Sequence, residues 1–226
     1  MINFAIVVPA RKNSKTLQNK NIHFLKNKHL IEYTFNAVKN LSYSKFVLTD
    51  SKKIKNISKK YNFNYDYNRP AKVSKDKTSS VETLLHFNEW LEKNFNKTFD
   101  YIVVLQPTSP LRRNVDVINS INLIKKNKFT TLFSVSESLE HPYETINIID
   151  KNRWNFNFKK SLKFYRRQDF DLNSYFINGA IYIAEIKYLK KYKRLYSNNH
   201  GLYFMKKYNS FDINDLEDIK IVKNLI

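Results

Sequence analysis

The sequence predicts an α/β protein in three layers, with a mostly parallel, twisted sheet covered by helices on both faces. Short apolar runs bounded by polar turns alternate with stretches of helical periodicity, which is the βαβ pattern of such a sheet. The chain has 226 residues, enough for one well-buried domain with an excursion. We therefore expect a single domain over residues 1–226.

The elements follow in order along the chain. Ser79 and Glu82 have capping-box spacing and mark the start of one helix. The expected strands cover residues 3–9, 45–49, 101–106, 130–135, 180–184 and 202–205, and the expected helices cover residues 29–39, 51–61, 79–93, 115–126, 186–192 and 215–225.

The alternation breaks between residues 137 and 176. This segment is rich in charge and in aromatic residues, and it offers one short strand candidate at residues 143–149. An insert of this kind packs poorly alone, so we expect a protruding arm that mediates dimerisation.

Composition limits the partners. The chain carries a formal charge of +20, but its lysines are scattered and accompany no nucleic-acid-binding signature, which favours solvated helix faces over a nucleic-acid surface. It contains no cysteine, and the first apolar run, Phe4 to Val8, is too short for a signal peptide or a membrane span. We expect a soluble cytoplasmic protein without nucleic-acid or membrane partners.

A basic loop follows the first strand. Arg11, Lys15 and Lys20 put three cations close to a strand end, and the backbone N–H groups of residues 12–15 are available to phosphate oxygens. The loop contains no glycine and no Gly-Lys-Ser/Thr, which excludes a P-loop and a Rossmann fingerprint. Phosphate binding is one interpretation of the loop, and a solvated basic loop is the other.

Two further segments carry polar groups. Residues 105–112, Leu-Gln-Pro-Thr-Ser-Pro-Leu-Arg, form a polar turn directly after an apolar strand, where an open parallel sheet places a ligand. Residues 210–214, Ser-Phe-Asp-Ile-Asn, present a carboxylate that could hold the metal ion of a polyphosphate. These segments together indicate nucleotide chemistry.

The loop Pro9-Ala10-Arg11 with Ser14-Lys15 and Lys20-Asn21 resembles the nucleotide-binding signature of the CMP-sialic acid synthetases, the acylneuraminate cytidylyltransferases. Later strings agree with this family in the same order along nearly the whole chain: Arg69-Pro70 with Asp76 and Ser79-Ser80, Gln106 to Arg112, Arg167-Gln168, Asn178 to Tyr182, and Phe211-Asp212-Ile213 with Glu217-Asp218. The resemblance implies a nucleotide-diphospho-sugar transferase-like fold.

The resemblance implies a CTP site. The loop with Arg11, Ser14 and Lys15 would wrap the triphosphate, and Lys20 and Asn21 would lie near the α-phosphate. Two further residues, Arg69 and Ser80, would read the cytosine, whose O2 and N3 accept and whose N4 donates hydrogen bonds. The alternative for Ser80 is a plain position in the first turn of a capped helix.

The resemblance also implies an acceptor site shared across a homodimer. Gln106, Asn178 and Tyr182 match positions that face the sugar, and the alternative interpretation of them is a strand end and a core tyrosine. Further positions, Arg167, Leu195 and Tyr196, match residues that family members lend to the neighbouring subunit.

The implied reaction is attack of a sugar's anomeric hydroxyl on the α-phosphate of CTP, with release of pyrophosphate. Arg11, Lys15, Lys20 and Asp212 would be the catalytic residues, and Asp212 would hold Mg²⁺ (or Mn²⁺). Asn214 replaces a carboxylate that is common in the family. It is either a second metal ligand or the N-cap of the final helix, because Glu217 follows it three residues later.

The expected acceptor is a sialic-acid-like nonulosonic acid of the neuraminic, legionaminic or pseudaminic type, and the sequence does not choose among them. A cytidylyltransferase for a different small acceptor in surface-glycan synthesis is the first alternative. The second is a nucleic-acid-binding protein that relies on its positive charge.

Overall fold

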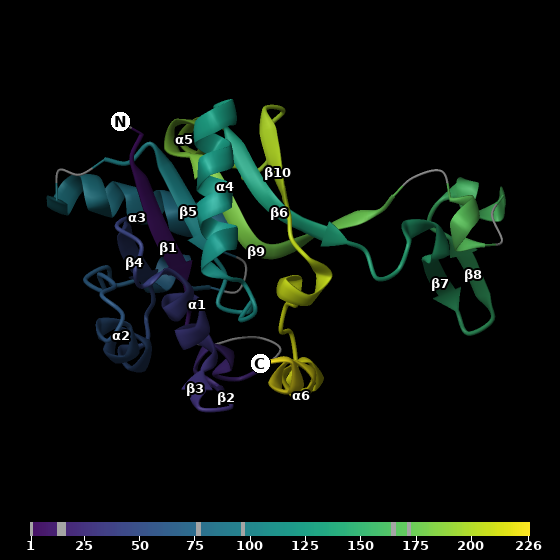
Figure 1. The fold of residues 1–226 in the computed structure, drawn as a ribbon, viewed down its shortest axis with the longest axis horizontal. Helices are drawn as coiled ribbons and strands as arrows, with labels where there is room; N and C mark the ends of the chain where they lie inside the picture. The colour runs from purple at the N-terminus through teal and green to yellow at the C-terminus, as the bar shows by residue number, and fades with distance from the viewer. Residues whose placement is uncertain (1, 13–16, 76–77, 96–97, 164–165, 171–172) are drawn as a thin grey trace.

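A six-stranded sheet forms the body of the protein in the computed structural model, which describes residues 2–12, 17–75, 78–95, 98–163, 166–170 and 173–226 (Figure 1). The strand order is β10-β6-β9-β5-β1-β4. The strands are β1 (Phe4–Pro9), β4 (Ser44–Leu48), β5 (Tyr101–Leu105), β6 (Thr131–Glu137), β9 (Tyr175–Glu185) and β10 (His200–Phe204). All run parallel except β9, which is antiparallel to both of its neighbours.

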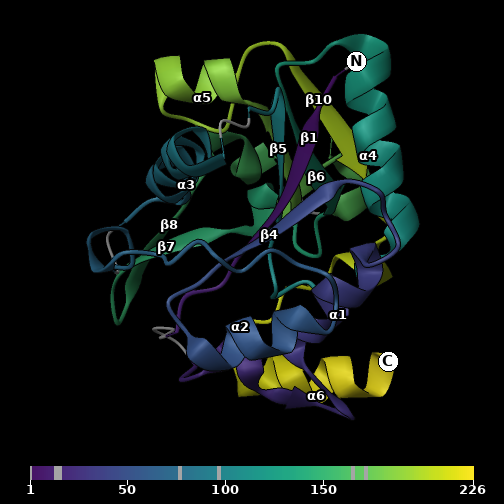
Figure 2. The ribbon, with the colours of Figure 1, turned by 90° about the vertical axis from the view of Figure 1, so that its left-hand side faces the viewer.

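Helices cover both faces of this sheet, as expected for buried parallel strands (Figure 2). The helices α1 (Leu30–Val38), α2 (Lys52–Lys59) and α4 (Asn114–Asn127) pack on one face. On the other face lie α3 (Ser80–Phe95) and α5 (Ile186–Tyr192). The predicted three-layer α/β fold is confirmed.

The final helix, α6 (Leu216–Leu225), lies apart from these layers. Its Ile219 and Val222 pack with Leu25 and Leu30 around a small third core. Leu25 belongs to a short antiparallel ribbon of β2 (Phe24–Leu25) and β3 (Lys28–His29), which the sequence did not indicate. This core joins the end of the chain to the region that follows β1.

Two strand predictions differ from the structure. The expected strand 180–184 is the buried half of the longer β9, whose first residues, Tyr175 to Ile177, are exposed. The expected strand 143–149 is a 3₁₀ turn at Pro142–Glu144 followed by a hairpin of β7 (Ile146–Asp150) and β8 (Arg153–Phe156). Apolar runs locate the core and cannot mark exposed strand ends.

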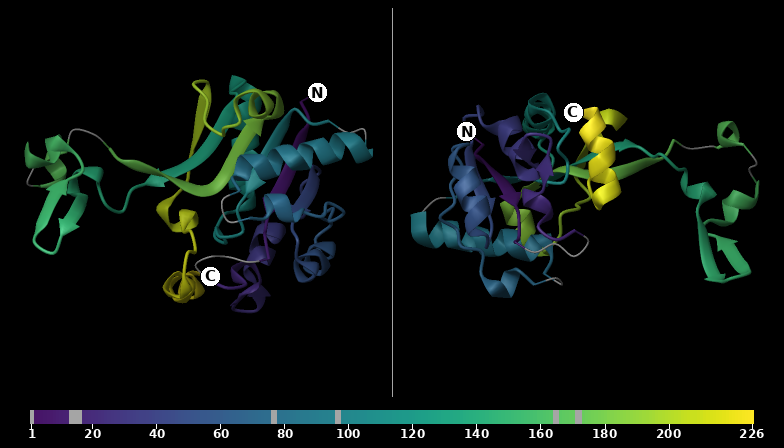
Figure 3. Two further views of the ribbon diagram at one scale, coloured as in Figure 1. Left: turned by 180° about the vertical axis from the view of Figure 1, so that it is seen from behind. Right: turned by 90° about the horizontal axis from the view of Figure 1, so that it is seen from below.

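The segment between β6 and β9 projects from the body as an arm (Figures 1 and 3). Its hairpin is exposed along β7, and Ile148 reaches 77% exposure. The protruding shape agrees with the expectation, and the role in dimerisation stays a prediction. Within the described part of the chain, no helix is long and apolar enough to cross a membrane.

Candidate active site

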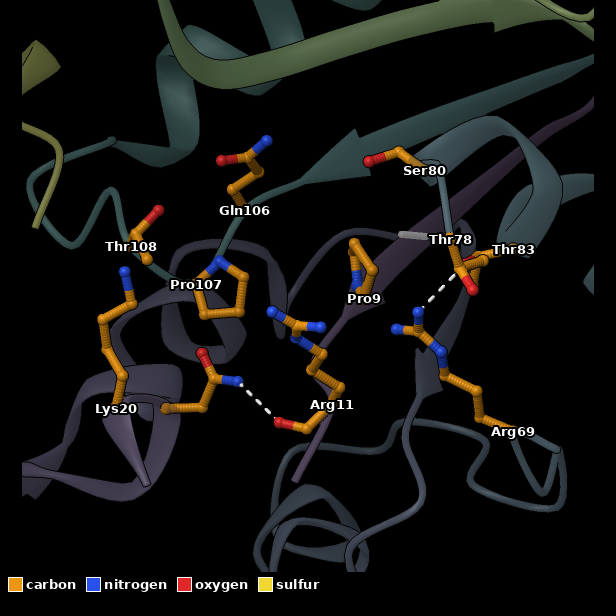
Figure 4. Close-up of a pocket in the computed structure, with 11 residues that line it drawn as sticks. Pro9, Arg11, Lys20, Arg69, Thr78, Ser80, Thr83, Gln106, Pro107 and Thr108 are labelled. Carbon is orange, nitrogen blue, oxygen red and sulfur yellow. Dashed lines mark hydrogen bonds between the residues drawn. The ribbon is translucent and has the colours of Figure 1, made fainter. Parts of the chain in front are cut away.

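A cavity of about 360 Å³ opens at the carboxyl ends of β1 and β5 (Figure 4). Parallel strands β1, β4 and β5 all end on this edge, so the loops after them converge there. The lining residues are Pro9, Arg11, Lys20, Asn21, Arg69, Thr78, Ser80, Thr83, Gln106, Pro107 and Thr108.

Three cations face the middle of this cavity from different segments. Figure 4 shows the nitrogen-bearing ends of Arg11, Lys20 and Arg69 directed into the same space. The predicted nucleotide residues Asn21 and Ser80 line it as well. Ser14 and Lys15 lie outside the described residues. The cavity therefore combines the charge and the polar groups that a nucleoside triphosphate requires.

The loop after β1 is fixed by two hydrogen bonds at its start. The Nδ2 of Asn21 donates to the carbonyl of Arg11 at 3.1 Å, and the backbone N–H of Lys12 donates to Oδ1 of Asp50 at 2.6 Å. Asp50 follows β4, and no sequence pattern indicated this contact. Asn21 thus shapes the loop in addition to lining the cavity.

Arg69 is held in place by two neighbours. Its Nε and Nη2 donate to the carbonyl of Val73 at 2.9 and 2.7 Å, and Nη2 also donates to Oγ1 of Thr83 at 3.0 Å. Burial lowers the pKa of Arg69, although nearby Asp50 opposes that shift. Arg69 comes before α3 in the chain, and its guanidinium, held against the first turn of that helix, suits base recognition. Ser80 is the first residue of that helix and follows Ser79, which forms a capping box with Glu82. Its position in the first turn is confirmed, and its contact with cytosine stays a prediction.

A second cavity of about 530 Å³ adjoins the first and shares Gln106 with it. It lies between β9 and the segment before α6. The remaining lining residues are Leu139, Phe176, Ile177, Asn178, Gly179, Tyr182, Lys207, Ser210, Phe211, Asp212, Asn214 and Asp218. All three predicted sugar-facing residues therefore line one cavity.

The antiparallel direction of β9 brings these residues to the site. Ile181 pairs with Leu105 at the end of β5, so the preceding residues of β9 pass beside Gln106. Gly179 adopts φ +74°, and a Cβ there would lie 3.3 Å from Oε1 of Gln106. Glycine at this position thus permits both the turn of the backbone and the close approach of Gln106.

Asp212 lines the second cavity and neighbours Thr108 and Lys20, which line the first. The N–H of Ile213 donates to the carbonyl of Thr108 at 2.9 Å, and Nζ of Lys20 donates to the carbonyl of Ile213 at 3.1 Å. Burial raises the pKa of Asp212, while hydrogen bonds from Thr108 and Asn214 and the charge of Lys20 counteract it. Burial also lowers the pKa of Lys20, and Asp212 opposes that shift.

The oxygen Oδ1 of Asp212 is buried and has no hydrogen-bond partner within the part of the chain that the structure describes. A buried anionic oxygen without a partner suits a cation. The described ranges contain no group of three or more His, Cys, Asp or Glu side chains arranged to hold a metal ion. A metal here would therefore need phosphate and water oxygens to complete its coordination shell.

The expected capping role of Asn214 is wrong. The N-cap of α6 is Asp215, whose Oδ1 accepts from the N–H groups of Glu217 and Asp218 at 2.9 and 3.0 Å. Asp218 in turn accepts from the N–H of Asn214 at 2.7 Å. The sequence offers Asp215 with Asp218 at the same capping-box spacing, which is the better match. Asn214 lines the second cavity, and its role as a metal ligand stays a prediction.

Arg112 received no role from the sequence, although it ends the polar turn after β5. It is buried, and its guanidinium donates to the carbonyls of Gln106 at 3.1 Å and Ala180 at 2.7 Å and to Oγ1 of Thr34 at 2.7 Å. Arg112 thus ties the end of β5 to β9 beneath Gln106.

The residues expected to reach a partner subunit lie in two places. Arg167 is part of a 3₁₀ turn on the arm, Arg167–Asp169. Leu195 packs against the core of its own chain, and Tyr196 is hydrogen-bonded to Tyr182 of the same chain. Their contribution to a partner's site stays a prediction.

The fold places this protein among nucleotide-sugar transferase-like α/β proteins. It matches a solved structure of CMP:2-keto-3-deoxy-manno-octonic acid synthetase in complex with CTP, with a TM-score of 0.70 over 99% of this chain and 98% of that chain. The two sequences are 14% identical, so the match establishes the fold alone.

A family model described as cytidylyltransferase matches residues 5–225, and the chain belongs to that family of nucleotidyltransferases. It is 29% identical to an N-acylneuraminate cytidylyltransferase of Escherichia coli over 95% of this chain. The matched region covers only 50% of the length of that relative. It is also 26% identical to a CMP-N,N'-diacetyllegionaminic acid synthase of Campylobacter jejuni, over 100% of this chain and 96% of the relative.

Proposed function

We propose that this protein transfers CMP from CTP to the anomeric hydroxyl of a sialic-acid-like nonulosonic acid. The observation that carries the proposal is the pair of adjoining cavities, one lined by cations and one by the predicted sugar-facing residues, with Gln106 in both. The activities of the two relatives, N-acylneuraminate cytidylyltransferase and CMP-N,N'-diacetyllegionaminic acid synthase, support the choice of CTP and of a nonulosonic acid.

The reaction joins the contents of the two cavities. The anomeric oxygen forms a bond to the α-phosphorus, the bond from that phosphorus to the oxygen bridging to the β-phosphate breaks, and pyrophosphate leaves. The hydroxyl proton passes to solvent water. Negative charge grows on the α-phosphate and on the leaving group, so Arg11 and Lys20 would stabilise the transition state more than the bound substrates.

We also propose that Asp212 holds Mg²⁺ (or Mn²⁺), with Asn214 as a second candidate ligand. The Oδ1 of Asp212, which is buried and has no hydrogen-bond partner among the described residues, supports this assignment of the metal ligand. When bound, the ion would neutralise charge on the phosphates. Asp212 itself would keep the ion at the boundary between the cavities, where Lys20 also lies.

The test is pyrophosphate release from CTP, with ATP, GTP and UTP as controls, in the presence of Mg²⁺ and a panel of nonulosonic acids. We expect release with CTP alone among the nucleotides. Asp212→Asn should lower the rate by about 100-fold or more, the scale on which charge stabilisation acts in enzymes. Thermal unfolding should show no loss of stability, because the variant removes a buried charge with an unpartnered oxygen.

A matched control is Asp66→Asn, since Asp66 is exposed and lines neither cavity. This variant should retain full activity. Release with several nucleotides at equal rates, or an unchanged rate for Asp212→Asn, would contradict the proposal.

A further inference from the structure

The second cavity has walls of different character. Gln106 and Asp212 supply polar groups on the side nearest the nucleotide cavity. Leu139, Phe176 and Ile177, from the ends of β6 and β9 near the arm, supply apolar groups. An occupant that extends away from the nucleotide therefore meets an apolar surface.

Two of the polar side chains in this cavity are already engaged by the chain itself. The Oδ1 of Asn178 accepts from Oγ of Ser134 at 2.6 Å and from the N–H of Ala180 at 3.2 Å, while Nδ2 contacts Sδ of Met205 at 3.5 Å. Tyr182 is hydrogen-bonded to Tyr196. These bonds reduce the number of groups that could serve the hydroxyls of a bound sugar.

The apolar wall is incompletely covered by the chain. Phe176 is 40% exposed, Ile177 41% and Leu139 59%. The cavity that this wall lines shares Gln106 with the nucleotide cavity, so an acceptor that reaches the nucleotide would contact the wall. Lys207 also lines this cavity and offers a cation to the carboxylate of an acid.

This arrangement distinguishes between acceptors. N-acetylneuraminic acid ends in a chain of hydroxyl groups, which would lose water against an apolar wall without gaining partners. A nonulosonic acid of the legionaminic or pseudaminic type carries a second acylamino group and a terminal methyl, and these would gain from contact with the same wall.

We propose that the acceptor is a diacylamino nonulosonic acid and that Leu139, Phe176 and Ile177 select it over N-acetylneuraminic acid. This inference rests on the function proposed above, and it concerns the part of the acceptor that lies away from the reacting hydroxyl.

The experiment compares kcat/KM for N,N'-diacetyllegionaminic acid and N-acetylneuraminic acid at saturating CTP and Mg²⁺. Three proteins are measured: the wild type, Ile177→Thr and the control Ile221→Thr. Threonine keeps the β-branched shape that strands favour and replaces the ethyl group of isoleucine by a hydroxyl. Ile221 is 46% exposed on α6 and lines neither cavity, so it matches Ile177 in residue type and exposure.

We expect the wild type to prefer the diacylamino acid by about tenfold or more, since small apolar groups discriminate on that scale. Ile177→Thr should lower the ratio of the two kcat/KM values roughly threefold or more, and Ile221→Thr should leave it unchanged. Leu139 lies outside the strands, so the variant Leu139→Thr repeats the test if Ile177→Thr does not fold.

A wild-type preference for N-acetylneuraminic acid would overturn this inference and leave the proposed function standing. If the ratio of the two kcat/KM values is the same in the wild type, Ile177→Thr and Leu139→Thr, the apolar wall does not select the acceptor. CTP binding by calorimetry without pyrophosphate release from either acid would instead refute the proposed function, and the inference with it.

Discussion

Arg112 shows how a single buried residue supports both cavities. Its charge is removed from water, and burial lowers the pKa of its guanidinium to about 9, which still leaves it charged at pH 7. It donates to two carbonyls and one hydroxyl at the junction of β5, β9 and α1, and Asp116 lies near enough to favour its charged form. Loss of this side chain would leave buried carbonyls without donors.

We expect Arg112→Met to lower the free energy of unfolding by about 3 kcal/mol, because Gln106 and Ala180 would lose hydrogen bonds in a buried setting. Urea titration measures the change. The adjacent Arg113→Met is the control. That side chain is 51% exposed and pairs with Asp116, so its loss should cost less than about 1 kcal/mol. Equal losses in the two variants would contradict the role of Arg112.

His86 makes stability depend on pH. Its Nδ1 lies 2.9 Å from the hydroxyl of Tyr67, and burial lowers its pKa below the ordinary 6.5, with Lys72 adding to the shift and Glu89 opposing it. The unfolded chain therefore binds more protons between the lowered pKa and 6.5. Stability from this group is present above pH 6.5 and falls as the pH drops through that window.

The free energy of unfolding should fall less between pH 7.5 and pH 5.5 in His86→Gln than in the wild type. Urea unfolding at both pH values measures this difference. His23→Gln controls for the removal of a histidine and should behave like the wild type. A wild-type loss of stability that persists in full in His86→Gln would refute this role.

At the residue scale, much of the site could be predicted because its residues directly follow predicted strands in the sequence. Arg11, Lys20 and Asn21 come soon after a predicted strand, and Gln106 comes directly after another, so the edge of a parallel sheet brings them together. The partner of a buried side chain depends on distant segments. For that reason the sequence did not indicate the bond between Asn178 and Ser134.

At the scale of elements, the start of α6 fixes the segment that carries Asp212. Asp215 caps this helix, and Asp218 accepts from the backbone of Asn214 and Asp215. The turn before the helix is therefore bonded to its first residues. The position of Asp212 beside Thr108 follows from this turn and from the bond between Ile213 and Thr108.

We expect Asp215→Ala to lower the free energy of unfolding by about 1 kcal/mol, the usual loss on removing an N-cap. Asn214→Ala should have a smaller effect on stability, because its backbone N–H still donates to Asp218. Thermal or urea unfolding of both variants measures the difference. A larger loss for Asn214→Ala would restore Asn214 as the residue that stabilises the helix.

The layers were predictable from periodicity, and the direction of one strand was not. The helices and the buried strands follow from apolar spacing. The arm separates β6 from β9 by a long excursion, so the chain returns antiparallel between β5 and β6. The spacing of apolar residues carries no information on strand direction. The antiparallel direction of β9 is what places Asn178 and Tyr182 at the site.

At the scale of the whole molecule, the arm exposes apolar side chains that the body does not cover. Ile148 is 77% exposed, Leu162 70% and Trp154 55%. Exposed apolar groups at this density indicate a protein contact. We predict a homodimer formed through the arm, as the sequence led us to expect.

Analytical ultracentrifugation should give a dimeric mass for the wild type and a monomeric mass for Ile148→Asp, because a charge would be buried in the contact. Ile221→Asp places the same charge on exposed α6 and should remain a dimer. A fully active wild-type monomer at assay concentration would exclude a site shared between subunits.

In the proposed reaction, CMP passes intact from CTP to a nonulosonic acid. We would follow the reaction of CTP, Mg²⁺ and the acceptor by ³¹P NMR. We expect the triphosphate signals to be replaced by one phosphodiester signal and by pyrophosphate in equal molar amounts. Formation of CDP with inorganic phosphate, or of free CMP without a phosphodiester, would contradict it.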